Sequence, residues 1–88
     1  MTTKEMVIKV LNKYSCLNGN QIKVSVYNEF GEVISAQSAA GILRSLIARG
    51  LAAKSADASG KMTYWLTTFG KEQLLKWIIM TMHGLVIN

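Results

Sequence analysis

The stretch from Ser35 to Gly70 constrains the fold most, because it combines a helix pattern with a hairpin pattern. Ser35 is a favoured residue at a helix N-terminus, and Gly50 is the kind of residue that ends one, since glycine enters the left-handed region at little cost. The helix is followed by two short apolar runs around a polar tip, which predicts a hairpin with strands Leu51–Lys54 and Lys61–Leu66 and tip Ser55–Gly60. Helix followed by hairpin predicts an α+β domain.

A further helix is expected on each side of this stretch. Thr67 can cap a last helix from about Thr68 to at least Met82. At the other end, the apolar residues of the first segment fall at helical spacing and predict a helix from about Thr3 to Tyr14, with Thr2 and Glu5 at capping-box spacing. Residues 15–20 contain Asn-Gly-Asn and are predicted to form a loop.

The segment from Gln21 to Phe30 fits two patterns. Ile22, Val24 and Val26 alternate with polar residues as in a strand, whereas Ile22, Val26 and Phe30 are four residues apart as in a helix. We prefer the helix, because it lies one turn upstream of a stronger helix. Residues 31–34 would then form the turn of a helix-turn-helix.

Composition limits the class of protein. The chain has 88 residues, half of them hydrophobic, which is enough for one domain with a modest core. The net charge of +5 favours a polyanionic partner. With one cysteine, Cys16, and one histidine, His83, neither an internal disulfide nor a zinc cluster can form, so we expect a cytoplasmic protein without metal or cofactor.

No membrane segment is expected from the sequence. The first residues lack the order of a secretory signal. The longest apolar stretch, Leu74 to Ile87, is interrupted by Lys76 and His83 and is shorter than the roughly 18–20 residues that a spanning helix needs.

Three motifs in this order resemble those of bacterial winged-helix regulators. Leu43-x-x-Leu46-x-x-x-Gly50-Leu51 resembles the end of their recognition helix. Leu66-Thr67-x-x-Gly70-x-x-x-Leu74 resembles the junction between wing and helix in the multiple-antibiotic-resistance and PadR-like groups, and Tyr64-Trp65 is similar to the second wing strand of small pilus phase-variation regulators.

The resemblance implies a fold and a function for the whole chain. It implies a single winged helix-turn-helix domain over residues 1–88, with the helix-turn-helix at about 21–50, the wing at about 51–66 and a C-terminal dimerisation helix at about 68–83. Members of these groups are DNA-binding transcription regulators and often homodimers. The expected partners are therefore double-stranded DNA, bound in a sequence-specific manner, and a second copy of the chain. The chain lacks the long extra helices that form the ligand pocket of larger members, so no small-molecule ligand is expected.

The same resemblance names candidate DNA-binding residues. The outer face of the helix that begins at Ser35 would lie in the major groove, and the wing would contact the backbone or the minor groove. The candidates are Ser35, Gln37, Ser38, Gly41, Arg44 and Ser45 on the helix, and Lys54, Ser55, Ser59 and Lys61 on the wing. Glutamine can pair with adenine and arginine with guanine. Alternatively, these side chains only form a solvated face.

The net charge of this region supports the hypothesis that it binds DNA. Between Ser35 and Trp65 the four basic residues Arg44, Arg49, Lys54 and Lys61 face one acid, Asp57, which gives +3 of the total +5. Gly41 costs the helix about 1 kcal/mol relative to alanine. A close approach to another helix or to DNA would explain it, and so would chance.

The last segment is apolar on nearly all sides. One helix in a small domain can bury only one stripe of side chains against the core, so this segment has more apolar side chains than its own core can cover. A homodimer interface is the expected use, with candidates Leu75, Trp77, Ile78, Ile79 and Met82. Alternatively, this segment folds back on its own core.

Nothing in the sequence indicates an enzyme. Cys16 and His83 have no acid placed by sequence to orient the histidine, and the five carboxylates are scattered. Two other functions stay open: a winged-helix protein-interaction module that uses the small residues Ala36, Ala40, Gly41 and Ala48, and a plasmid or phage protein for DNA partition or architecture.

Overall fold

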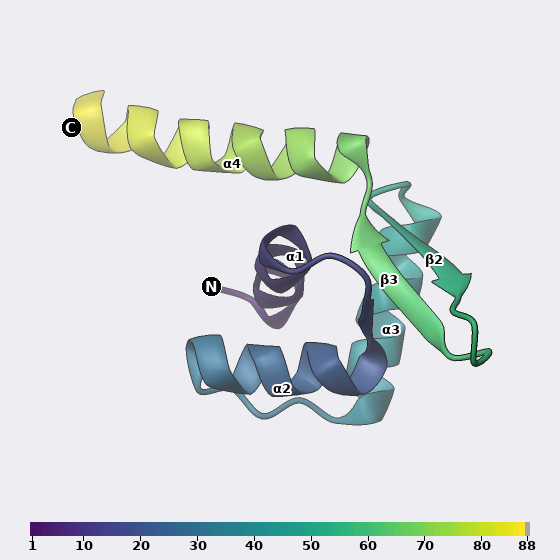
Figure 1. Ribbon diagram of the computed structural model, residues 1–88. Helices are drawn as coiled ribbons and strands as arrows, with labels where there is room; N and C mark the ends of the chain where they lie inside the picture. Colours follow the sequence, from purple (N-terminus) through teal and green to yellow (C-terminus); the bar gives the residue numbers. More distant parts are fainter. Residues whose placement is uncertain (88) are drawn as a thin grey trace.

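The computed structural model describes the backbone of residues 1–87 and the side chains of residues 1–80. Its elements, in chain order, are α1 (Thr3–Lys13), β1 (Leu17–Asn18), α2 (Gly19–Phe30), α3 (Ala36–Ala48), β2 (Ala52–Ala56), β3 (Met62–Leu66) and α4 (Thr68–Ile87) (Figure 1). Three helices, a hairpin and a last helix make the α+β winged helix-turn-helix that the sequence predicts.

The core lies where α1, α2, α3 and the base of the hairpin meet. Each of the first three helices is amphipathic and buries one stripe of apolar side chains. The buried residues are Val7, Ile8, Val10, Leu11, Ile22, Val26, Ile34, Ala39, Leu43, Leu46, Leu51, Ala52, Leu66 and Leu74. No buried polar side chain is found among the residues whose side chains are described. This core fixes the direction of α3 relative to the hairpin.

Side-chain caps start the helices where the sequence places polar residues. The Thr2 hydroxyl accepts a hydrogen bond from the Glu5 amide at 3.2 Å, and the Ser35 hydroxyl accepts one from the Ser38 amide at 3.0 Å. Asn18 and Gln21 form a reciprocal capping box, with both hydrogen bonds at 2.9 Å. Because Asn18 caps α2, the helical reading of residues 21–30 is confirmed and the helix begins earlier than expected.

The predicted loop over residues 15–20 is therefore wrong from Leu17 onward, since β1 and the first turn of α2 take up residues 17–20. Leu17 and Asn18 form the short strand β1, which pairs antiparallel with β3 through Leu17–Tyr64 and Asn18–Thr63. The strand order is β1-β3-β2. Strand β1 is too short for a period-2 pattern, so its pairing depends on contacts distant in the sequence.

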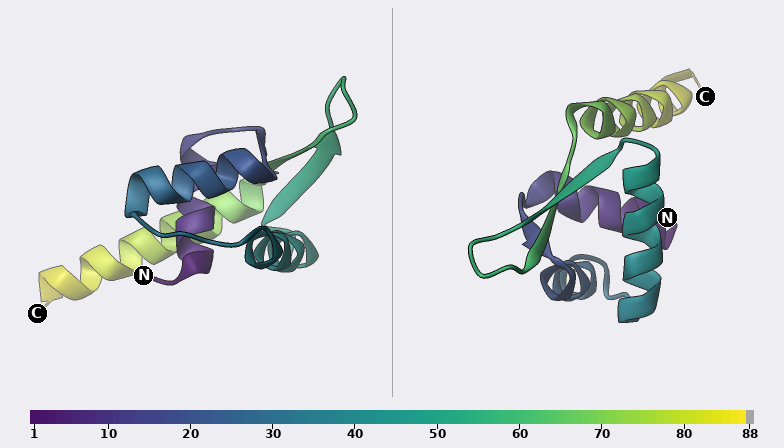
Figure 2. Two further views of the ribbon diagram at one scale, coloured as in Figure 1. Left: turned by 90° about the horizontal axis from the view of Figure 1, so that it is seen from below. Right: turned by 90° about the vertical axis from the view of Figure 1, so that its right-hand side faces the viewer.

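The wing strands also differ from the predicted boundaries. Strand β2 continues through Ser55 and Ala56, which pair with Thr63 and Met62, so these two residues do not belong to the tip. Pairing along β3 overrides their low strand propensity. Figure 2 shows the hairpin projecting away from the helices beside α3.

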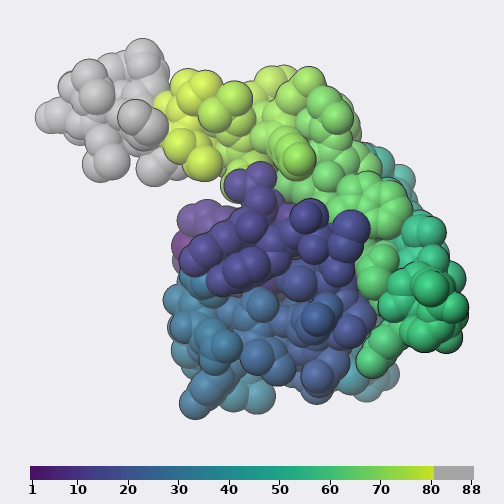
Figure 3. Space-filling view, viewed as in Figure 1, coloured from purple at the N-terminus to yellow at the C-terminus, as the bar shows by residue number. Residues whose placement is uncertain are grey.

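Helix α4 begins at the cap that the sequence predicts. The Thr67 hydroxyl accepts a hydrogen bond from the Gly70 amide at 3.0 Å. The helix passes over α1 (Figures 1 and 3). Its ribbon continues beyond the rest of the fold (Figure 1). Within the described part of the chain, no helix combines the length and apolar character needed to cross a membrane.

Candidate nucleic-acid interface

The outer face of α3 carries most of the predicted contact residues. Gln37, Ser38, Gly41 and Arg44 are exposed, and Ser45 is half-buried. Opposite them, Ala39, Leu43 and Leu46 are buried in the core. Because the two sets alternate at helical spacing, core packing determines which side of α3 faces outward.

Ser35 is exposed, but its hydroxyl is used at the start of the helix. It accepts from the Ser38 amide and donates to the Ser38 hydroxyl at 2.9 Å. The two predicted contact residues Ser35 and Ser38 are thus hydrogen-bonded to each other. Their first role in this structure is to cap α3.

The structure divides the predicted residues of α3 between two sides of the helix. Ser38, Gly41 and Ser45 line a hollow of about 530 Å³ that α3 forms with the start of α1 and the connector before α3. This hollow also includes one cation, Lys4, and one carboxylate, Glu32. The α1 side of the helix is therefore mixed in charge.

Arg44 lies on the other side of α3, toward the wing. It lines a hollow of about 210 Å³ together with Lys54 of β2 and Tyr64 of β3. A neighbouring hollow of about 220 Å³ includes Lys23 of α2 and the same Tyr64 ring. Neither lining contains an acid, so the wing side of α3 is cationic.

The register of the hairpin explains why Lys54 joins this side and Ser55 does not. Lys54 pairs directly with Tyr64, and residues opposite each other in an antiparallel pair share a face. Ser55, one position along the strand, belongs to the opposite face of the wing together with its partner Thr63. The predicted wing contacts therefore do not form one surface.

The wing tip is held by one carboxylate. Oδ1 of Asp57 accepts hydrogen bonds from the Ser59 hydroxyl at 2.7 Å and from the Ser59 and Lys61 amides at 2.9 Å each. The bond from the Ser59 hydroxyl and the one from the Lys61 amide hold the pKa of Asp57 below its ordinary value. Ser59 thus orders the tip, while the Lys61 side chain is exposed at its base.

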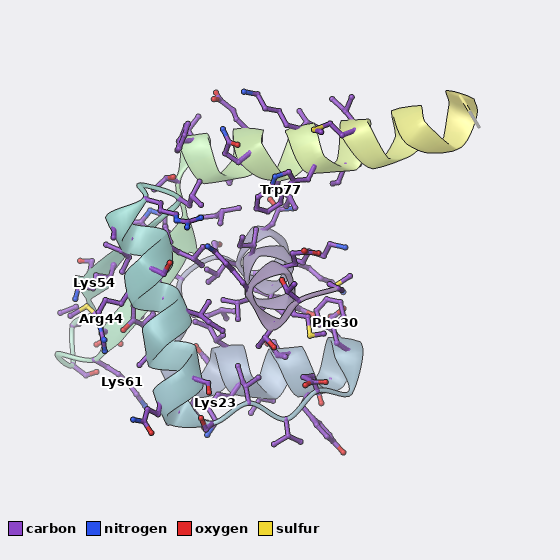
Figure 4. The ribbon with its side chains drawn as sticks, turned by 180° about the vertical axis from the view of Figure 1, so that it is seen from behind. Lys23, Phe30, Arg44, Lys54, Lys61 and Trp77 are labelled. Carbon is purple, nitrogen blue, oxygen red and sulfur yellow. The ribbon has the colours of Figure 1, made fainter. Side chains whose placement is uncertain are left out.

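None of the cations Arg44, Lys54 and Lys61 forms an ion pair with a side chain that the structure describes. Among the side chains that the structure describes, the ion pair joins Lys13 and Glu29, away from the wing. Figure 4 shows Arg44, Lys54 and Lys61 grouped beside α3, with Lys23 near the start of the same helix. The one acid of the α3–wing segment, Asp57, is engaged by the tip.

Sequence reasoning missed two residues of this surface, Lys23 and Tyr64. Lys23 lies in the segment predicted as a helix, and it reaches this surface because α2 packs across the start of α3. The sequence predicts Tyr64 as a strand residue, and Tyr64 lines both hollows because β3 is the central strand of the sheet. The alternation of Tyr64 and Trp65 was the one available signal, since adjacent strand residues point to opposite faces.

The candidate dimer residues of α4 are accessible as far as the structure describes them. The exposed fractions are 55% for Leu75 and Ile79, 43% for Ile78 and 39% for Trp77. The Trp77 ring lies on the side of α4 that faces α1 (Figure 4). Met82, the fifth candidate, lies outside the residues whose side chains are described.

Cys16 is exposed and borders a hollow of about 260 Å³ on the other face of the sheet, with Trp65 and Lys71. No three metal-ligating side chains come together within the described residues.

No protein-family model and no curated protein matches the sequence, whereas solved structures do match. RosR of h. salinarum superposes with a TM-score of 0.84 at 22% identity, over 100% of this chain and 80% of that one. A winged-helix DNA-binding protein from STIV superposes with a TM-score of 0.76 at 19% sequence identity, over 88% of this chain and 84% of that one. MepR, a transcription regulator of the Staphylococcus aureus multidrug efflux pump MepA, has a TM-score of 0.74 at 18% sequence identity. The match covers 99% of this chain and 64% of that one.

These similarities establish the winged-helix fold. A MarR family transcriptional regulator from Silicibacter pomeroyi is a further neighbour, at 23% identity and a TM-score of 0.73. The neighbours include winged-helix regulators such as RosR, which is archaeal, so a bacterial origin stays a prediction. The resemblance to PadR-like and pilus regulators also stays a prediction.

Proposed function

We propose that this chain is a sequence-specific, double-stranded DNA-binding transcription regulator that acts as a homodimer. The observation that carries the proposal is the cationic surface formed by α3 and the wing, where Arg44 and Lys54 border one hollow without a neighbouring acid. Duplex DNA binds such surfaces because phosphate neutralisation releases counterions. The titles of the structural neighbours, which include a winged-helix DNA-binding protein and a transcription regulator, support the same function.

In the proposed complex, α3 lies in the major groove with its wing side toward the bases. Gln37 and Arg44 are seven residues apart, which is about 10 Å along a helix axis and corresponds to about three base pairs. Gln37 would pair with adenine and Arg44 with guanine. Lys23, Lys54 and Lys61 would neutralise phosphates on either side of the groove.

The division of α3 into two sides refines the list of contacts. Gln37 and Arg44 stay as the proposed base contacts, whereas Ser38 and Ser45 are assigned to the α1 side, away from the wing. Gly41 lines that same hollow, and a Cβ built there meets nothing within 4 Å. No close approach inside the molecule therefore explains this glycine, and Gly41 belongs with Ser38 and Ser45 on the α1 side, away from the proposed base contacts.

The exposed apolar side chains of α4 support a dimer joined through this helix. Leu75, Ile78, Ile79 and Met80 are between 43% and 70% exposed in the single chain. Pairing with a second copy would bury them, and a two-fold dimer would present two α3 helices to adjacent major grooves.

The test is the salt dependence of duplex binding, measured by fluorescence anisotropy. If the three lysines of each subunit neutralise one phosphate each, six contacts predict a slope of about −5 for log K against log[salt]. A duplex from the protein's own locus should compete better than a shuffled duplex of the same composition. No binding at low salt by a folded protein would contradict the proposal and would favour a protein-interaction module.

A further inference from the structure

The junction between β3 and α4 ties the last helix to the end of α3. The Thr67 hydroxyl donates a hydrogen bond to the Gly50 carbonyl at 2.6 Å and accepts one from the Gly70 amide at 3.0 Å. The Thr67 amide also donates to the Leu51 carbonyl at 3.1 Å. One residue thus links the segment that ends α3 to the first turn of α4.

Gly70 brings α4 into direct contact with the same segment. A Cβ at this position would overlap the carbonyl oxygen of Leu51 and would lie 2.9 Å from Cγ of Leu66. Glycine is the residue that allows this approach, since any side chain would push the helix away from the backbone of Leu51. The motif Thr67-x-x-Gly70 therefore builds a close joint.

Beyond this joint α4 meets the body of the fold through Leu74 and through Trp77, whose ring lies on the side that faces α1 (Figure 4). Among those described from residue 68 to 80, Gly70 and Leu74 are buried. Leu75 and residues 78–80 are exposed, and the helix extends past the body of the fold (Figure 1). The joint thus fixes the direction in which α4 leaves the end of α3, and Leu74 and Trp77 seat the helix beyond it (Figure 4).

A small change of angle at this joint has a large effect at the far end. Helix α4 has 20 residues, which corresponds to a length of about 30 Å. A tilt of about 10° at the first turn therefore moves the other end by about 5 Å, given that length. This exceeds the rise of one base pair, about 3.4 Å.

We propose that Thr67 and Gly70 are positioning residues that fix the angle between α4 and α3 and thereby set the half-site spacing of the operator. This inference rests on the proposed function, since it requires a dimer that is joined through α4 and binds DNA through α3. The two residues touch neither DNA nor the second copy. They act through the direction of the helix that joins the subunits.

The first experiment compares Thr67→Val with Thr67→Ser. Valine has nearly the shape of threonine but no hydroxyl, whereas serine keeps the hydroxyl. Affinities are measured for duplexes whose half-sites are separated by the preferred number of base pairs, by one more and by one fewer. Adding one base pair rotates a half-site by about 35°, so a rigid dimer discriminates strongly.

The wild type and Thr67→Ser are expected to prefer the same spacing, and Thr67→Val is expected to lose that preference. If Thr67 only stabilised the fold, Thr67→Val would lower the denaturation midpoint and leave the spacing preference unchanged. That result would overturn the inference.

A second measurement needs no DNA and so separates the two proposals. Spin labels are attached at Gln37→Cys and Lys76→Cys in a Cys16→Ser background, and the distance between them is measured by pulsed dipolar spectroscopy at high dilution with unlabelled protein. A narrow distribution is expected for the otherwise unmodified chain and with Thr67→Ser, and a broad one with Thr67→Val. If Thr67→Val does not fold, Gly70→Ala takes its place, and the mean distance should shift.

If the distance distribution between the two spin labels stays unchanged in the folded variant, the joint does not fix the angle of α4. That result would refute the inference even if the wild type binds DNA. Failure of the wild type to bind DNA would refute the proposed function and with it the spacing role.

Discussion

Replacing Gly70 by alanine tests the close packing of α4 against the end of α3. The added methyl group would overlap the Leu51 carbonyl oxygen and would lie 3.0 Å from the Leu51 carbonyl carbon. Because these atoms belong to the backbone, they cannot rotate away. Overpacking of this kind costs typically about 1–3 kcal/mol, whereas alanine gains up to about 1 kcal/mol over glycine in a helix. We expect a net loss of about 1–2 kcal/mol.

Gly41→Ala is the matched control. Gly41 is also helical, but nothing lies within 4 Å of a Cβ built there. The same substitution should therefore stabilise the protein by about 0.5–1 kcal/mol. The two variants are predicted to shift the free energy of unfolding in opposite directions.

Urea denaturation followed by circular dichroism measures both changes. The protein concentration must be fixed, because a dimer unfolds with a concentration-dependent midpoint. At about 4–8 °C per kcal/mol, Gly70→Ala should lower the melting temperature by about 5–15 °C. Equal or greater stability of Gly70→Ala would refute the packing argument, as would a loss of stability in Gly41→Ala equal to that in Gly70→Ala.

Three further predictions concern the surface and the ion pair. Arg44→Ala should weaken specific DNA binding, measured by anisotropy titration, by about 1–3 kcal/mol without changing the urea midpoint. The control Lys71→Ala removes a cation on the other face of the sheet and should have a small effect on the same titration. Equal losses of affinity in the two variants would argue against base contact by Arg44. Ile79→Glu should convert dimers to monomers in sedimentation velocity, because Ile79 is exposed in the single chain, and an unaltered mass would exclude the α4 interface. A hydrogen bond from Lys13 at 2.7 Å, and then one from Tyr14, lower the pKa of Glu29. Its contribution to stability is therefore present above the unfolded pKa and lost as pH falls through the folded pKa. NMR titration should find a higher Glu29 pKa in Lys13→Ala than in the wild type, and equal values would contradict this ion pair.

The sequence predicted the elements that are governed by local rules. The N-caps Thr2, Ser35 and Thr67 lie where polar residues precede helical patterns, and the structure confirms all three hydrogen bonds. The choice between helix and strand for residues 21–30 was also correct. The capping box of Asn18 and Gln21, which decides it, was a local signal that the prediction did not use.

Features that depend on distant contacts could not be predicted in the same way. Strand β1 exists because Leu17 and Asn18 pair with Tyr64 and Thr63, more than forty residues later. The end of β2 at Ala56 depends likewise on its pairing with Met62. Local propensity carries no information on either partner.

The sequence predicted which residue types form the candidate site, but not which side of α3 each residue lies on. Helical spacing separates outer from inner residues of α3, yet it does not say which neighbour each flank faces. The positions of α1 and the wing decide that Ser45 lines one hollow and Arg44 another. The same packing brings Lys23 and Tyr64 to the surface, which no local pattern indicated.

The most direct test of the central claim is an NMR titration of the labelled protein with an operator duplex, which reports the contact surface residue by residue. If α3 and the wing bind DNA as proposed, the largest amide shifts will fall on residues 36–48 and 54–61, with smaller shifts near Lys23. Shifts confined to α1 or α4, or no shifts at low salt, would contradict the account.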